Sequence, residues 1–131
     1  AQGAFLLAHR MGLIEDPSME GLKARRQKHN EELRRMEQEG QRFYGPHYFS
    51  APAYLQYECT RFRLAFAGER KQVRYNYAPI TAREEKAYYK ANKDLFTRYM
   101  GDKFRFREVK QVVRKKMREE EYDRAVQDLL R

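Results

Sequence analysis

The stretch SMEGLKARRQKHNEELRRMEQE, residues 18–39, is the clearest sign of the fold. One set of its side chains recurs at spacings of three, four and seven residues, as on one side of an α-helix. This set is Met19, Leu22, His29, Leu33 and Met36. Charged residues cover the rest of the helix. A stripe this narrow packs against one neighbour, so we expect the helix to project or to form a two-helix arm.

The segments on either side of this helix carry their own start and stop signals. A short apolar helix is expected over residues 4–11, and Gly12 follows where a glycine would end it. Asp16 or Ser18 is placed to cap the long helix, and Gly40 ends it. Ser50, with Pro52 in the first turn, starts a third helix that runs to about residue 70. Residues 73–79 are expected to form a loop.

Two more helices follow in the last fifty residues. Thr81 and Glu84 have the spacing of a capping box, which opens a helix over residues 84–92. Residues 93–96 and 101–102 are expected to be an irregular link, and the last helix covers residues 106–130. Its expected buried side consists of apolar residues at helical spacing: Val109, Val112, Val113, Met117, Tyr122, Val126, Leu129 and Leu130.

These signals predict an all-α protein with long amphipathic helices and a single domain over residues 1–131. With only 7 Gly and 4 Pro, the chain lacks the frequent turns that a β-sandwich or barrel needs. No apolar run reaches the ~18 residues that would span a membrane. The chain starts at Ala1 without an initiator Met and without a leader, so it is interpreted as a mature or N-terminally truncated fragment.

The net charge of +9 favours polyanionic partners in general. However, the 28 basic residues are interleaved with 19 acidic ones, which is typical of solvated helix faces with i,i+4 pairs. Basic stretches at residues 104–107 and 113–118 would suit phosphate contacts, but no helix-turn-helix or RNA-binding strand motif accompanies them. Nucleic-acid binding is therefore the third interpretation.

No catalytic centre, metal site or cofactor site is predicted. Three histidines at positions 9, 29 and 47 lie in separate segments without metal-ligand spacing. Cys59 is the only cysteine and is expected to be a half-buried structural thiol. Glu119, Glu120 and Glu121 are expected to balance basic residues one turn earlier in the last helix. The protein is accordingly predicted not to be an enzyme.

The aromatic turn at residues 43–49 has two interpretations. Grouped aromatic rings can fasten a helix corner, or they can form an apolar platform for unfolded peptide, since tyrosine buries a ring while its hydroxyl stays hydrated. On the second interpretation the predicted peptide-binding residues are Tyr44, Tyr48, Phe49, Tyr54 and Tyr57.

Three segments resemble chaperone domains of the SurA/PrsA type. PITAREEKAYYKANKDLF (79–96) resembles the I-T-x-x-E-x-x-x-Y-Y-x-x-N-x-x-x-F helix that precedes the parvulin isomerase domain in that family. FREVK (106–110) resembles the start of the helix that closes the domain, and FLLAHRMGL (5–13) resembles a hairpin near its beginning. The middle, with YGP at 44–46, resembles a variant from isomerase-like proteins of Gram-positive bacteria.

The resemblance implies a chaperone domain without isomerase activity. Only nine residues lie between Phe96 and Phe106, whereas a parvulin domain needs roughly 90. The implied function is reversible binding of unfolded or extended polypeptide at the cell envelope, near its anionic surface, with a cytoplasmic location as the alternative. A second interpretation is a helical homo-oligomer, because helices longer than the core needs could be exchanged between two chains as a domain-swapped dimer.

Overall fold

The computed structural model describes residues 2–41, 48–96 and 104–130. These residues form α1 (Gln2–Arg10), α2 (Met19–Gln38), α3 (Ala51–Ala67), α4 (Ala82–Ala91), the short 3-10 helix η1 (Lys93–Phe96) and α5 (Phe106–Leu129). No strand occurs in the described part of the chain, and the prediction of an all-α fold is confirmed. The boundaries differ from the expected ones by a few residues, and residues 93–96 form η1 where an irregular link was expected.

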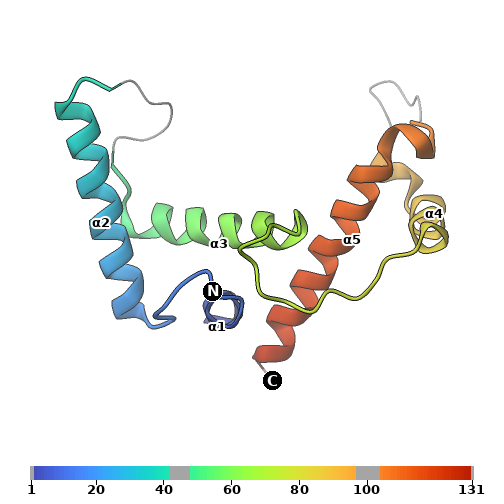
Figure 1. Cartoon of the computed structure of the whole chain (residues 1–131), viewed down its shortest axis with the longest axis horizontal. Coiled ribbons are helices and arrows are strands. Elements are labelled where there is room, and N and C mark those ends of the chain that lie inside the picture. The colour runs from blue at the N-terminus through green and yellow to red at the C-terminus, as the bar shows by residue number, and fades with distance from the viewer. Residues whose placement is uncertain (1, 42–47, 97–103, 131) are drawn as a thin grey trace.

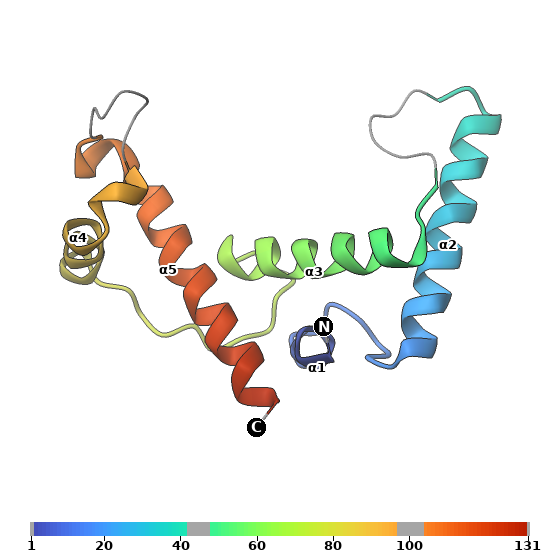
Figure 2. The same cartoon turned by 180° about the vertical axis from the view of Figure 1, so that it is seen from behind.

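The helices form an open arch around α3. Figure 1 shows α3 as a crossbar, with α2 standing at one end and α5 at the other, and Figure 2 shows the same arrangement from behind. α1 lies below the crossbar, packed against α3 and α5, while α4 packs on the other side of α5. α2 packs on α3, as its narrow stripe predicted, and projects beyond it.

Among the described residues, two hydrophobic clusters lie at opposite ends of α5. The larger joins α1, α3 and the second half of α5 around Phe5, Phe62 and Phe66, which are buried. The smaller joins α4, η1 and the first half of α5 around Phe96 and Val113. α5 therefore links two apolar clusters, and each faces a different side of this helix.

Three helices, α2, α3 and α4, begin directly after the cap residues that the sequence predicted. The hydroxyl of Ser18 accepts a hydrogen bond from the N–H of Gly21 at 3.2 Å. The hydroxyl of Ser50 accepts one from Ala53 at 3.3 Å, and that of Thr81 accepts one from Glu84 at 3.2 Å. These caps satisfy backbone donors that the first turn of a helix leaves free.

The predicted buried side of α5 was partly wrong. Val109, Val113 and Tyr122 are buried, but Val112 is 47% exposed and Leu130 is 57% exposed. The charged side chain of Arg118 is buried instead, at 1% exposure. Because α5 packs on two clusters that face different sides of it, one continuous apolar stripe does not describe its contacts.

Candidate functional site

Four rings form an aromatic corner where α2 meets α3. We use this name for His29 of α2, Phe49 before α3, and Tyr54 and Tyr57 of α3. The ring centroids lie between 5.1 Å (Phe49 to Tyr57) and 5.7 Å (His29 to Tyr54) apart. Distances in this range are typical of aromatic pairs that stabilise one another. The aromatic corner thus fastens the long arm α2 to the crossbar.

Polar side chains of α2 hold the chain that enters the corner. The Asn30 amide donates to the carbonyl of Phe49 at 3.1 Å and accepts from its N–H at 2.8 Å. Arg26 donates to the same carbonyl at 2.9 Å and to the Tyr48 hydroxyl at 2.7 Å. The backbone of Phe49 is therefore satisfied by side chains, because no regular ladder exists there.

The five predicted peptide-binding residues take different places. Phe49 and Tyr57 are half-buried in the aromatic corner, while Tyr54 is only 3% exposed. Burial, and next the charge of Glu58, raise the pKa of Tyr54 to about 12. Tyr48 stands outside the corner and is 64% exposed. Tyr44 lies outside the described residues.

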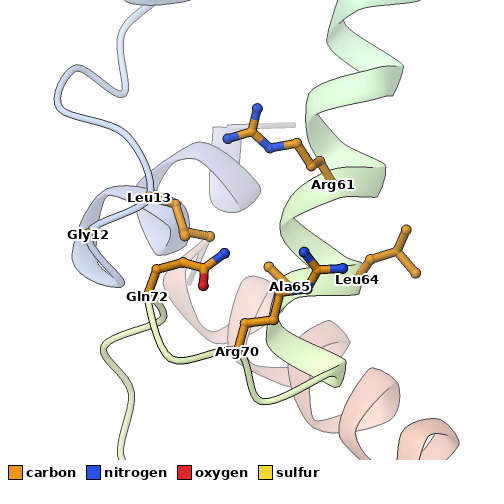
Figure 3. Close-up of a pocket in the computed structure, with 7 residues that line it drawn as sticks. All are labelled: Gly12, Leu13, Arg61, Leu64, Ala65, Arg70 and Gln72. Carbon is orange, nitrogen blue, oxygen red and sulfur yellow. The ribbon is translucent and has the colours of Figure 1, made fainter.

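A second feature is a groove along the outer side of α3, which we call the α3 groove. It consists of two adjoining hollows that share Arg61 and Leu64. The first, with a volume of about 430 Å³, is lined by Gly12, Leu13, Arg61, Leu64, Ala65, Arg70 and Gln72. The second, of about 380 Å³, is lined by Ala53, Gln56, Tyr57, Thr60, Arg61 and Leu64. Figure 3 shows the first hollow between α3 and the loop that follows α1.

Unpaired guanidinium groups surround the α3 groove. Across residues 2–41, 48–96 and 104–130, no carboxylate lies within ion-pair distance of Arg61 or Arg70. A third guanidinium, that of Arg74, packs on Gly12, where a Cβ would lie 2.7 Å from its Nε. Gly12 has a φ of +79°, which a residue with a side chain rarely adopts. Arg61 and Arg70 place positive charge in the hollow that Leu64 also lines, and Leu64 is 44% exposed.

Acidic partners are found for four arginines of the described residues: Arg25, Arg63, Arg114 and Arg118. Arg25 donates to the buried carboxylate of Glu58, with the closest contact at 2.8 Å. Arg63 pairs with Asp123 at 3.0 Å. These pairs tie α2 to α3 and α3 to α5, so their charges are already balanced within the fold.

A network of ion pairs lies between the two hydrophobic clusters. Glu69 accepts from Arg114 at 2.8 Å and from Arg118 at 3.2 Å, and Arg118 also donates to Glu121 at 2.6 Å. The guanidinium of Arg118 lies 4.6 Å from the ring centre of Tyr77. The hydrogen bond from Arg114 is the main cause that lowers the pKa of Glu69. This network had no local signal, since Glu69 and Arg118 are 49 positions apart.

The predicted balance of charge within α5 is confirmed for Glu119 and Glu121, whereas Glu120 accepts a hydrogen bond from the Tyr88 hydroxyl of α4 at 2.9 Å. Lys116 lies 3.7 Å from Glu119, and Arg118 pairs with Glu121. Cys59 is half-buried, as predicted, and burial raises the pKa of its thiol. The residues that the structure describes contain no cluster of metal-ligating side chains. None of the described helices is long and apolar enough to cross a membrane.

Comparison with known proteins shows that this helical fold is similar to part of a glycoside hydrolase. No protein-family model matches the chain, and no curated protein matches it. Two crystal structures of a GH136 lacto-N-biosidase from Eubacterium ramulus match it, one of the native protein and one of its selenomethionine derivative. Both are 25% identical, with TM-scores of 0.80 and 0.77. Each match covers 98% of this chain but 26% of the enzyme, so the chain spans about a quarter of that enzyme's length.

This finding overturns the resemblance to SurA/PrsA-type chaperone domains. The non-catalytic chaperone function and its peptidyl-prolyl isomerase context are wrong, and neither the homo-oligomer nor the nucleic-acid alternative is better supported. The segment at residues 79–96 resembled a chaperone helix because it carries a capping box followed by two adjacent tyrosines, Tyr88 and Tyr89. Such features report that a helix starts there, and they do not report how helices pack together.

The prediction that the protein is not an enzyme is corrected as well. Over nearly its whole length, the chain matches two crystal structures of one enzyme, a glycoside hydrolase. Sequence reasoning looked for a nucleophile, base or metal within this chain. It had no means of detecting that a helical segment without such a motif is similar to about a quarter of an enzyme's length.

Proposed function

We propose that this chain is the helical part of a glycoside hydrolase related to GH136 lacto-N-biosidase. It would act together with a larger part that corresponds to the unmatched length of that enzyme. The observation that carries the proposal is the match over 98% of the chain at a TM-score of 0.80 and 25% identity. A match that extends over the whole arch argues for a shared module, since a common helix pair would match only locally.

The carboxylates in this chain suggest how the work is divided. Most glycoside hydrolases use a pair of carboxyl groups, one of which is a general acid with a raised pKa. Glu69 has a lowered pKa, and Glu58 is held by three hydrogen bonds from Arg25. Both carboxylates balance arginines, and the other buried carboxylates of the described residues, Glu85 and Glu119, also lie near basic side chains, those of Arg114 and Lys116. We therefore assign the catalytic carboxylates to the larger part of the enzyme and a supporting role to this chain.

A complementation experiment tests the proposal. The Eubacterium ramulus lacto-N-biosidase is produced without the segment that this chain matches, and this chain is supplied with it, either as a separate polypeptide or fused in place of the segment. Hydrolysis of p-nitrophenyl lacto-N-bioside is measured by the release of p-nitrophenol. We expect this chain to raise the rate at least about tenfold above that of the shortened enzyme. A tenfold increase corresponds to lowering the activation free energy by about 1.4 kcal/mol.

Two controls make the result interpretable. The enzyme's own segment, supplied in the same two ways, shows how much activity can be recovered. A helical protein of similar size and net charge shows whether any basic helical protein has the same effect. Recovery by the enzyme's own segment but not by this chain, in either arrangement, would contradict the proposal.

A further inference from the structure

We propose that the α3 groove is a docking site for an acidic segment of the larger glycoside hydrolase part. The segment would place a carboxylate between Arg61 and Arg70 and an aliphatic side chain against Leu64. This inference rests on the proposed function and adds to it the face of the chain that meets its partner and the chemistry of that partner.

The shape of the α3 groove suits an extended segment. Its residues on α3 follow one helical stripe at spacings of three and four residues: Ala53, Gln56, Tyr57, Thr60, Arg61 and Leu64. The opposite side of α3 is occupied by the core, where Phe62 and Phe66 are fully buried. The two hollows together run along about three turns of the helix and are open to solvent, as a site for a segment laid along the surface would be.

The charges of the α3 groove define what it would accept. Arg61 and Arg70 point toward the hollow in Figure 3, and no acidic side chain of the described residues pairs with them. A partner that covered these guanidinium groups with neutral surface would remove their water without replacing it, which is costly. A carboxylate restores the lost interactions and can form two parallel hydrogen bonds with a guanidinium group. The partner's contact is therefore acidic.

The same charges argue against a second copy of the chain. Each copy has a net charge of +9, and pairing two α3 grooves would bring Arg61 and Arg70 of one copy against those of the other. Like charges placed opposite one another disfavour association. In contrast, the match leaves about three quarters of the enzyme's length outside this chain, which provides a partner of sufficient size.

The test measures binding of the chain to the shortened enzyme used for complementation. One variant carries Arg61→Gln with Arg70→Gln, and another carries Leu64→Asp. The control carries Lys23→Gln with Arg35→Gln, which removes the same charge from exposed sites on α2 outside the α3 groove. We expect the Kd of both groove variants to rise at least tenfold, and that of the control to change less than twofold. Circular dichroism checks that each variant keeps its helix content.

Salt dependence and crosslinking give independent measurements. Raising the salt concentration should weaken wild-type binding more than binding of the Arg61→Gln, Arg70→Gln variant, because salt screens exposed charges. A photoreactive p-benzoylphenylalanine at position 64 should crosslink to a stretch of the enzyme that contains Asp or Glu. The same group at position 19, where Met19 is 61% exposed, serves as the control and should give little of that product.

The outcomes separate the two proposals. If the wild-type chain neither binds nor restores activity while the enzyme's own segment does, the proposed function fails and the docking site fails with it. If the wild-type chain restores activity and the groove variants bind as tightly as it does, only the docking site is overturned. Crosslinks from position 64 to a second copy of the chain, or to a stretch without acidic residues, overturn it as well.

Discussion

Arg118 shows how a charged side chain is accommodated inside this fold. It is 1% exposed, yet two carboxylates and the ring of Tyr77 contact its guanidinium. Its Nε has no hydrogen-bond partner within the described residues. A buried charge is tolerated only when its lost water is replaced, so the stability of this region depends on Glu69 and Glu121.

Substitution of Glu69→Gln should therefore destabilise the protein. The variant loses a carboxylate that accepts hydrogen bonds from Arg114 and Arg118 and leaves the buried guanidinium with one acidic partner. We expect the free energy of unfolding to fall by about 2 kcal/mol, less than for a fully buried pair because Glu69 is partly exposed. Urea denaturation measures the change. Asp123→Asn, which breaks an exposed pair with Arg63, should cost less than about 1 kcal/mol.

The same carboxylate predicts a dependence of stability on pH. The pKa of Glu69 is lowered in the folded protein, chiefly by the hydrogen bond from Arg114. Its contribution is thus fully present above the unfolded pKa, which is about 4.3, and is lost as the pH falls through the folded value. Wild-type stability should drop between pH 5 and pH 3 by more than that of Glu69→Gln. Parallel pH profiles for the two proteins would contradict this assignment.

At this scale, the sequence predicts local features and misses distant ones. The caps at Ser18, Ser50 and Thr81 were predicted because donor and acceptor lie three residues apart. The pairing of Glu69 with Arg118 could not be predicted, since it depends on how α5 packs on the chain after α3. Likewise, the charges of the α3 groove could be counted in the sequence, but the convergence of Arg61 and Arg70 requires the fold.

Among the elements, α3 packs against three other helices, α1, α2 and α5, and its start is sharply defined. Ser50 caps it, Pro52 lies in its first turn, and Tyr54 enters the core directly afterwards. α2 reaches α3 mainly through the aromatic corner and the ion pair of Arg25 with Glu58. A helix start that also holds the neighbouring arm should be sensitive to loss of its cap.

Ser50→Ala should lower the free energy of unfolding by about 1 kcal/mol, the usual effect of losing a serine cap. The physical reason is that the N–H of Ala53 loses its acceptor at the helix start. Thermal and urea unfolding measure the change. Thr60→Ala is the control, because it alters an exposed position inside α3 where alanine favours the helix and stability should not fall. Equal effects of the two substitutions would show that the cap contributes nothing.

The order of helices was predictable, but the sides they bury were less so. Residues 19–38 form α2 nearly as expected because its stripe, its cap and its end signal agree. α5 was predicted with one buried stripe, whereas Val113 faces one cluster and Tyr122 the other. A single helical period describes a helix with one packing partner, and α5 has several.

At the scale of the molecule, the described residues form two hydrophobic clusters of unequal size, and this difference should be visible in hydrogen exchange. α4 contacts α5 and η1, whereas α3 is packed by α1, α2 and α5. Hydrogen exchange under native conditions should therefore show faster exchange for the amides in the middle of α4 than for those in the middle of α3, because local opening follows the number of packed neighbours. Equal protection of the two helices would mean that both clusters unfold as one unit.

The structural similarity to part of a glycoside hydrolase lies beyond what the sequence alone predicts. The quoted motifs indicate where single helices form, and they were informative about these helices. They did not test how helices are arranged in an arch, which is where the similarity to the Eubacterium ramulus enzyme lies. With 25% identity over a match that covers 98% of the chain, the similarity is evident mainly in the tertiary structure.

The arch has a mechanical consequence. α2 and α5 are about 30 Å and 36 Å long, and each extends well beyond its crossing with the bar α3, α5 with α4 packed on its side. They are therefore levers: turning a 30 Å helix by 10° about one end shifts its other end by about 5 Å. A partner seated along the bar would need to cause only small displacements there to change the spacing of both tips. A partner bound at α3 would then determine where the far ends of α2 and α5 lie.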